Sequence, residues 1–293
     1  MRYPPTTMFS ALRKAPLVLL LLAGCSKSET VPAYLEIPSM VLSTTPEQGV
    51  ATSKITDVWV SVNDRLVGVW ELPARIPVIG EGSDRITVVP AIKRNGMYDD
   101  RLRYPFFASW SGDVVLSEQS SVSIAPTTSY FSTTDIWIES FDDIGTLVEP
   151  SDPADSLIRF TIEEHPTLVR DNTPCGGAML TSGNPSVRIQ TDQDFLGASG
   201  PVFLELDFST DVQLVVGVRY NQAGFDTVEP VVVLTPTTPN GNSPIWNKVY
   251  IDLSALFNTG AVNERDIYIE GALSSGMSSG LFLVDNIKLV RSE

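Results

Sequence analysis

Short apolar segments with alternating polar residues run along most of this chain, and residues typical of turns separate them. In residues 55–62 the three valines fall on alternate positions and would share one face of a strand. Another such segment, residues 85–92, is followed by the turn dipeptide Asn95-Gly96. Beyond residue 24 no segment shows a helical period long enough for the crossovers of a parallel sheet. The sequence therefore predicts an all-β protein.

The strand pattern stops and restarts once, in the Pro-, Thr- and Ser-rich segment 126–134. Residues 33–130 would hold about seven strands, which is the size of an immunoglobulin-like β-sandwich. Residues 131–293 would hold roughly eight or nine strands with turn-rich connections, and a jelly-roll β-sandwich is the expected arrangement for them. We therefore predict two successive β-sandwich domains.

The first 24 residues have the composition of a targeting segment. Arg2, Arg13 and Lys14 form a positive region without an acidic residue, and the apolar run 15–22 follows them. This run is too short to cross a bilayer as a permanent helix, which needs roughly 20 apolar residues. It therefore predicts export rather than a transmembrane anchor.

Residues 22–25, Leu-Ala-Gly-Cys, resemble the lipobox of bacterial lipoproteins. The resemblance implies that residues 1–24 are a signal peptide that is removed, that Cys25 carries lipid, and that residues 25–32 form a tether. Several acyl chains give a stable membrane anchor. The alternative is an ordinary secretory signal with an incidental cysteine. In this family Ser26, rather than aspartate, after the cysteine favours the outer membrane; the face on which the body lies, periplasmic or cell-surface, is left open.

The charge of the chain excludes one class of partner. The net charge is -15, and removal of three basic residues with the signal peptide would make it -18. Such a chain is not expected to bind nucleic acid, whose phosphates require Lys and Arg. Two interpretations of the acidic residues remain: they keep the protein soluble, or a few of their carboxylates bind calcium. Cys175 would have no partner within the chain if Cys25 is lipidated, and we expect it to be buried; a catalytic pair with the single histidine, His165, is the alternative.

Three segments of the C-terminal half resemble galactose-binding-like jelly rolls of carbohydrate-binding modules. They are 139–143 (ESFDD), 245–254 (IWNKVYIDLS) and 282–289 (FLVDNIKL). The resemblance covers about half of the chain and implies the jelly-roll fold. It also implies a structural calcium near the first and last strands, with Asp142, Asp285 and Glu139 as ligands beside backbone carbonyls. The alternative is that Asp142 caps a turn and Asp285 ends an exposed strand face. The N-terminal half is similar, in a general way, to lipoproteins of the Bacteroidetes envelope.

One loop offers residues suited to bind a sugar. Tyr220, Asn221, Gln222 and Phe225 combine aromatic rings with amides that can hydrogen-bond hydroxyls. Most other aromatic residues of this half alternate within strands and are more simply explained as core. We therefore select these four residues as the candidate ligand site.

No catalytic motif is present. One histidine excludes a histidine metal cluster, and neither a Gly-rich phosphate loop nor a Gly-x-Ser-x-Gly elbow occurs. We expect a non-catalytic, membrane-anchored lipoprotein that acts as a binding or assembly component of the bacterial envelope, with its distal jelly roll contacting an envelope protein. The alternatives are a glycan-binding accessory lipoprotein of a polysaccharide capture or uptake system and a cryptic glycoside hydrolase, since the 35 acidic residues could hide a carboxylate pair.

Overall fold

The computed structural model describes residues 1, 31–80, 82–238, 243–260, 262 and 264–292. Most of the predicted signal peptide, the predicted lipidation site Cys25 and most of the predicted tether lie outside these residues. In the described part of the chain, no helix has the length and apolar character needed to cross a membrane. Its two helices are short, η1 (Pro46–Gln48) and α1 (Ser254–Phe257).

The strands before residue 130 form an N-terminal sandwich. One layer has the order β4-β3-β6-β7, with β8 paired to the other end of the long strand β6. The facing layer contains β5-β1-β9 and the two-stranded sheet β10-β2. The bounds are β1 (Ala33–Ile37), β2 (Val41–Ser43), β3 (Asp57–Val62), β4 (Arg65–Glu71), β5 (Ala74–Val78), β6 (Gly82–Lys93), β7 (Arg101–Arg103), β8 (Trp110–Leu116), β9 (Ser121–Ser123) and β10 (Thr127–Ser129).

Alternation along the strands explains this sandwich. Leu35 and Ile76 from one layer meet Val60 and Val88 from the other in a core that excludes solvent completely. The residues between them along each strand, such as Arg75, are more exposed. Antiparallel sheets with one solvated face show this pattern, because successive side chains point to opposite faces.

The strands from residue 134 onward form a C-terminal sandwich. One layer, here called the junction sheet, has the order β13-β14-β22-β17-β20, with β11 paired to the second half of β22. The other layer, the open sheet, has the order β12-β15-β21-β18-β19, with β16 against β21. The bounds are β11 (Thr134–Glu139), β12 (Val148–Pro150), β13 (Ile158–Phe160), β14 (Cys175–Thr181), β15 (Ser186–Thr191), β16 (Phe195–Leu196), β17 (Val202–Thr210), β18 (Gln213–Gln222), β19 (Phe225–Leu234), β20 (Asn247–Asp252), β21 (Glu264–Ala272) and β22 (Ser279–Ser292). Leu204, Val216 and Ile269 lie in the core between the two layers.

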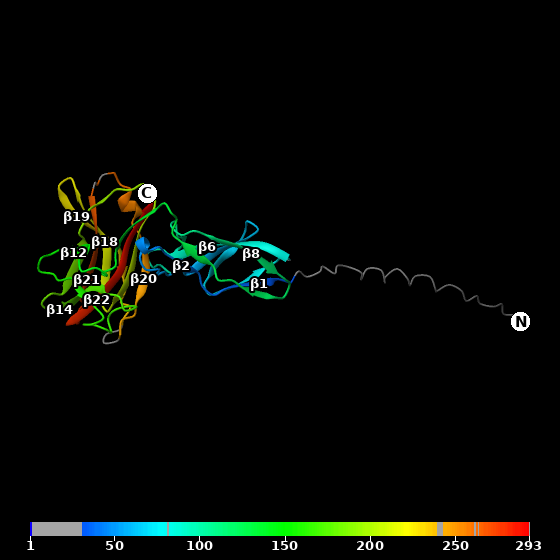
Figure 1. Ribbon diagram of the computed structural model, residues 1–293, viewed down its shortest axis with the longest axis horizontal. Helices are drawn as coiled ribbons and strands as arrows, with labels where there is room; N and C mark the ends of the chain where they lie inside the picture. Colours follow the sequence, from blue (N-terminus) through cyan, green and yellow to red (C-terminus); the bar gives the residue numbers. More distant parts are fainter. Residues whose placement is uncertain (2–30, 81, 239–242, 261, 263, 293) are drawn as a thin grey trace.

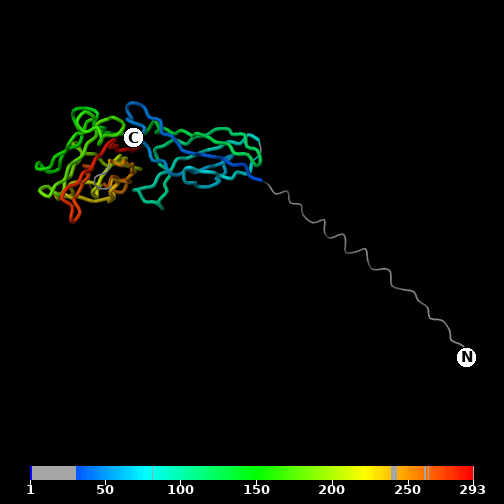
Figure 2. The backbone as a smooth tube through the Cα atoms, turned by 90° about the horizontal axis from the view of Figure 1, so that it is seen from below, coloured from blue at the N-terminus to red at the C-terminus, as the bar shows by residue number. Residues whose placement is uncertain are grey.

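The two sandwiches follow one another along the long axis of the molecule (Figure 1). A view from below shows the same end-to-end arrangement (Figure 2). The predicted fold class, an all-β chain with an immunoglobulin-like sandwich followed by a jelly-roll sandwich, is confirmed.

Strand β14 is an element that the sequence pattern did not predict. It pairs with β22 in the interior of the junction sheet, and a Cβ atom at Gly177 would lie 2.1 Å from the backbone oxygen of Phe282. A glycine is therefore needed for the two backbones to approach. Cys175, at the start of this strand, is buried and free within the described residues. Burial raises the pKa of its thiol to about 12, so the thiol is protonated at neutral pH and is a poor nucleophile.

Aromatic side chains join the two sandwiches. Tyr104 and Phe107 of the N-terminal sandwich pack edge-on or tilted against Phe203 and Tyr250 of the junction sheet, with ring centroids 4.6 to 6.3 Å apart within the cluster. All four side chains are almost completely buried. Such an interface resembles a domain core, so the two sandwiches are expected to move as one body.

Candidate functional site

The outward face of the junction sheet is covered along its length. At one end Phe203, Tyr250 and Val290 lie beneath the N-terminal sandwich. At the other end Phe160 and Leu283 lie in a small cluster with Leu168 and Val169 from the segment between β13 and β14. A layer of buried charged residues occupies the space between these two apolar regions.

Glu205 is at the centre of this charged layer, and none of its surface is exposed. Its Oε1 accepts hydrogen bonds from the hydroxyls of Tyr104, at 2.8 Å, and Tyr130, at 2.9 Å, while Lys248 Nζ lies 3.2 Å from Oε2. Burial raises the pKa of both tyrosines well above its usual value, and the negative charge of Glu205 raises it further. The carboxylate therefore fixes two tyrosines of the N-terminal sandwich to the junction sheet.

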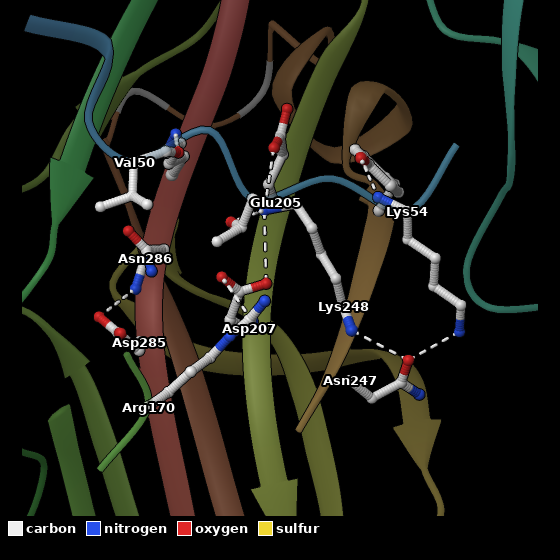
Figure 3. A network of polar contacts seen from close by, with 12 residues as sticks. Val50, Lys54, Arg170, Glu205, Asp207, Asn247, Lys248, Asp285 and Asn286 are labelled. Atoms are coloured by element: carbon white, nitrogen blue, oxygen red, sulfur yellow. Dashed lines mark hydrogen bonds and ion pairs between the residues drawn. The ribbon is translucent and has the colours of Figure 1, made fainter. Parts of the chain in front are cut away.

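A segment of the N-terminal sandwich, residues 44–54, crosses the same face (Figure 3). Lys288 of β22 donates from Nζ to the backbone oxygens of Gln48, at 2.6 Å, and Val50, at 3.0 Å. Burial lowers the pKa of Lys288 to about 8. Because this segment and the aromatic interface cover the sheet, an extended ligand cannot lie across the junction sheet.

The open sheet instead presents polar side chains to solvent. Arg188 forms an ion pair with Glu270 at 2.6 Å and lies 5.0 Å above the ring of Tyr268. Tyr268 is almost fully buried on this face, because it lies against Gly217, where a Cβ would come within 2.8 Å of the ring. The outward face of the open sheet thus carries charged and amide groups.

A pocket of about 350 Å³ lies at one end of the open sheet. Its lining residues are Asp194, Arg219, Tyr220, Asn221, Asp226, Glu264 and Asp266. They come from the β18–β19 hairpin, from the start of β21 and from the residue before β16. The pocket is within the ~300–1,000 Å³ range of small-ligand sites.

Arg219 organises the hairpin side of the pocket. Its guanidinium binds Asp226, with Nη2 2.9 Å from Oδ2, and Nη1 donates to Gln190 Oε1 at 2.9 Å. The hydrogen bond with Arg219 is the main cause of a lowered pKa at Asp226. The arginine is therefore held from both sides, by β19 and by β15, which lies beyond β21, and its position is defined before any ligand binds.

Two carboxyl groups meet on the other side of the pocket. The pKa of Asp266 is raised to about 6, first by burial and then by the charge and hydrogen bond of Asp194. A carboxyl group beside another carboxylate holds its proton more tightly, because a like charge disfavours ionisation. At neutral pH this side of the pocket therefore offers mainly acceptors, opposite the N–H donors of Arg219.

The hairpin that frames the pocket ends in a tight turn at Ala223-Gly224. Both residues have positive φ, 55° and 85°, as a type I′ turn requires. Positive φ is unfavourable for alanine. Asn221 Oδ1 accepts the backbone N–H of Gly224 at 2.9 Å and so stabilises the turn. The turn places Tyr220 and Asn221 beside the pocket.

The structure brings together half of the ligand residues predicted from the sequence. Tyr220 and Asn221 line the pocket, and the hydroxyl of Tyr220 donates to Glu229 Oε2 at 2.8 Å. Gln222 and Phe225 do not line it; Phe225 is 74% exposed at the hairpin tip. Whether any of these residues contacts a ligand stays a prediction.

Sequence reasoning missed the other pocket residues. Asp226 lies directly across the hairpin from Asn221, two residues beyond Arg219, so the opposite charges of Arg219 and Asp226 could have been recognised as a diagonal cross-strand pair. Asp194 and Asp266 lie far apart in the sequence, and no local pattern relates them. Only the pairing of β16 with β21 brings their segments together.

Two of the three residues predicted to bind calcium, Glu139 and Asp285, accept hydrogen bonds from the protein's own backbone, whereas Asp142 is exposed. Both carboxylate oxygens of Glu139 accept backbone N–H groups, from Phe141 at 2.5 Å and from Leu147. Asp285 is buried, and its Oδ1 accepts the backbone N–H of Asn286 at 2.7 Å. Burial raises the pKa of Asp285 to about 8, so that its carboxyl group favours the protonated form at neutral pH.

The nearby carbonyl oxygens are also occupied by a cation from the chain. Arg159 donates from Nε to the oxygen of Phe141 at 2.7 Å and from Nη2 to the oxygen of Asp142 at 3.0 Å. Within the described residues, no group of three or more His, Cys, Asp or Glu side chains could hold a metal ion. The residues in this arrangement therefore do not fit a calcium site, and calcium binding stays a prediction to be tested.

Comparison with known proteins gives structural similarities only. No family model and no curated protein matches this sequence. Similar solved structures include the carbohydrate-binding module TmCBM61 in complex with β-1,4-galactotriose (10% identity, 50% of this chain, 87% of that chain, TM-score 0.31). They also include CBM28, a module specific for non-crystalline cellulose (13% identity, 52% and 91%, TM-score 0.37), and the arabinose-bound α-L-arabinofuranosidase MgGH51 (12% identity, 52% and 25%, TM-score 0.38). At these identities and TM-scores, the chain is similar to carbohydrate-binding modules without any ligand or activity being assigned to it.

Proposed function

We propose that this protein is a non-catalytic glycan-binding lipoprotein that takes its ligand in the pocket of the open sheet. One observation carries the proposal: the junction sheet is covered by the N-terminal sandwich, whereas the open sheet presents a polar pocket of about 350 Å³. The only large outward face of the jelly roll left for an extended ligand, among the described residues, is therefore the open sheet.

The chemistry of the pocket favours hydroxyl groups. Arg219 supplies N–H donors, Asp194 and Asp266 supply acceptors, and Asn221 can do both. A sugar hydroxyl donates one hydrogen bond and accepts others, so it matches this mixture. Four of the seven lining residues carry carboxyl groups, and one is a cation. Repulsion by the carboxylates should exclude anionic polysaccharides, and neutral glycans are the expected ligands.

The orientation of the chain suits a membrane-anchored binding protein. Strand β1 begins at the end of the N-terminal sandwich that is remote from the jelly roll (Figure 1). A lipid on Cys25 would therefore leave the jelly roll farthest from the membrane. We propose the outer membrane as the location, with the ligand either a captured polysaccharide or a glycan of the envelope itself. An envelope protein as partner is the alternative prediction, and the exposed Phe225 is the residue that it would use.

A glycan array with the purified protein, followed by calorimetric titration of each retained glycan, tests the proposal. We expect neutral glycans to bind, and Arg219→Ala and Asn221→Ala to weaken binding at least about tenfold. Gln213→Ala, at an exposed position at the other end of strand β18, is the matched control and should bind as the unchanged protein does.

Two results would count against glycan binding at this pocket. The first is that no neutral glycan binds, and the second is that the Arg219 and Asn221 variants bind as well as the control. If an envelope protein copurifies instead and is lost with Phe225→Ala, the assembly role is supported.

A further inference from the structure

A second, smaller pocket opens where the two sandwiches meet. It has a volume of about 170 Å³ and lies between the segment that crosses the junction sheet and strand β20. Its lining residues are Thr52, Ser53, Lys54, Arg170, Asp207, Trp246, Asn247 and Lys248. It belongs to the opposite face of the jelly roll from the pocket of the open sheet.

The pocket contains a buried carboxylate without a hydrogen bond. Asp207 is 0% exposed, and neither of its carboxylate oxygens accepts a hydrogen bond within the described structure. Arg170 Nη1 lies 3.5 Å from Oδ2 and Lys248 Nζ lies 3.6 Å from Oδ1. Both distances exceed the 2.7–3.2 Å of an N–H···O hydrogen bond. Figure 3 shows the three side chains close together beneath the crossing segment.

Lys248 has closer partners than Asp207. Its Nζ lies 3.2 Å from Glu205 Oε2 and donates to Thr52 Oγ1 at 3.2 Å. A buried carboxylate can accept about four hydrogen bonds, and almost all buried polar groups in native proteins have at least one partner. The carboxylate oxygens of Asp207 have no accessible surface, so a ligand hydroxyl reaches them only where the partly exposed Arg170 side chain gives way.

The charges around Asp207 define which donors are suitable. Lys54, Arg170 and Lys248 all line the pocket, and they would repel a ligand ammonium group. A ligand carboxylate would meet the negative charge of Asp207. A hydroxyl group avoids both conflicts, because it donates to the carboxylate and accepts from the cations. Lys54 Nζ already donates to Asn247 Oδ1 at 2.7 Å, which places both groups at the pocket rim.

Size and shape point to one small ring. Drug-sized ligands occupy pockets of ~300 Å³ or more, whereas a cavity of about 150 Å³ holds a six-membered ring such as benzene. Trp246 lines the same pocket and supplies an aromatic surface beside the polar groups. A ring with apolar C–H groups and several hydroxyls can use both kinds of contact.

We propose that this junction pocket binds a single neutral sugar ring, with adjacent hydroxyls donating to Asp207 and accepting from Arg170 and Lys54. The ring lies beside Trp246. This site is independent of the pocket in the open sheet, and it gives the protein a second contact with a glycan at the seam between its two sandwiches.

The tryptophan indole N–H signals in an NMR titration of the purified full chain report directly on this pocket. The chain has five tryptophans, and Trp246 is the one that lines the pocket, so the other four serve as internal references. The probes are glucose, galactose and mannose, with glucuronate as the anionic and choline as the cationic comparison. We expect at least one hexose to shift the Trp246 signal with a dissociation constant of about 1 mM, which is typical of a ligand with so few atoms.

Variants connect the signal to the proposed contacts. Asp207→Asn should weaken the hexose response at least about tenfold, and Asn247→Ala and Lys54→Met provide the same test at the rim if Asp207→Asn does not fold. Asp266→Asn, in the open pocket, should leave the Trp246 response unchanged. A retained Trp246 response without any glycan bound in the open pocket would overturn the proposed function and support this inference.

The inference is overturned if no hexose shifts the Trp246 signal up to about 50 mM, far above the expected dissociation constant. It is also overturned if glucuronate or choline shifts it in place of the hexoses. A hexose response that is unchanged in every folded Asp207, Asn247 and Lys54 variant would place the ligand elsewhere.

Discussion

The two outer faces of the C-terminal sandwich use charged residues in opposite ways. On the junction sheet Glu205 and Lys248 are buried and bind residues of the N-terminal sandwich, and Asp207 is buried beside them. On the open sheet Arg188 and Glu270 form a partly exposed ion pair within one face. Buried charges must be matched closely because desolvation is costly, whereas exposed pairs are screened by water. The comparison indicates that one face is used for assembly of the protein itself and the other is left open to solvent.

The largest expected effect comes from removing the central carboxylate of the covered face. Glu205→Ala would leave Lys248 without its nearest counter-charge and two tyrosine hydroxyls without an acceptor. We expect a loss of about 3–5 kcal/mol in the free energy of unfolding, the usual cost of breaking a buried ion pair. Denaturant unfolding monitored by tryptophan fluorescence measures it.

The matched control is Glu270→Ala on the open sheet, which removes a partly exposed pair and should cost less than about 1 kcal/mol. Similar costs for the two variants would show that the two faces do not differ in the way proposed.

A smaller effect is expected from the lysine that holds the crossing segment. Lys288→Met leaves the backbone oxygens of Gln48 and Val50 without their donor, so we expect a loss of about 1–3 kcal/mol. The same variant should make residues 44–54 a site of limited proteolysis. Arg75→Met, which removes an exposed pair with Glu36 in the N-terminal sandwich, should change neither property. Equal protease resistance of Lys288→Met and the unchanged protein would contradict this role.

The open pocket should show a pH-dependent effect of about 1 kcal/mol. The pKa of Asp266 is raised, so the folded state binds the proton more tightly than the unfolded state, and stability falls as pH rises from about 4 to about 6. Asp266→Asn removes this cost; discounted for partial exposure, it should stabilise the protein by about 1 kcal/mol at pH 8. The gain should disappear near pH 4. Melting temperatures across this pH range provide the measurement.

Asp226, in the same pocket, should give a pH dependence of stability with the opposite sign. Its pKa is lowered by Arg219, so its ionised form contributes stability that is present above about pH 4 and lost as pH falls through the lowered pKa. Asp226→Asn should therefore lower the melting temperature slightly at neutral pH. Identical pH profiles for the two variants would contradict this assignment of the pocket carboxyl groups.

The smallest expected effect concerns calcium. The carboxylate of Glu139 already accepts backbone N–H groups, and Arg159 already binds the nearby carbonyl oxygens. A chelator and excess calcium should therefore both leave the melting temperature unchanged. A ligand that binds only the folded state at 100 times its dissociation constant adds about 2.7 kcal/mol. A clear rise of the melting temperature with calcium would therefore restore the site predicted at Asp142, Asp285 and Glu139.

The fold was predictable to a large extent, because alternation of side chains along a strand is a local property. The alternating segments 55–62 and 85–92 predict strands, and β3 and β6 lie at these positions. Strand β14 was missed, since Gly176 and Gly177 carry no strand signal; they are required only by tertiary contacts, Gly176 by the ring of Phe141 and Gly177 by the backbone of β22. Tyr220 and Asn221 were selected on local grounds as well, because an aromatic ring and amide groups stand together in one short segment.

By itself the sequence determined the all-β class, the candidate ligand loop at residues 220–225 and the candidate lipid anchor, since each depends on neighbouring residues. Only the tertiary structure decided which face of the jelly roll is covered. Glu205 and its partner Tyr104 are 101 residues apart, and Lys288 and Gln48 are 240 apart. Periodicity shows which side chains share a face, but what lies opposite that face depends on how distant segments pack.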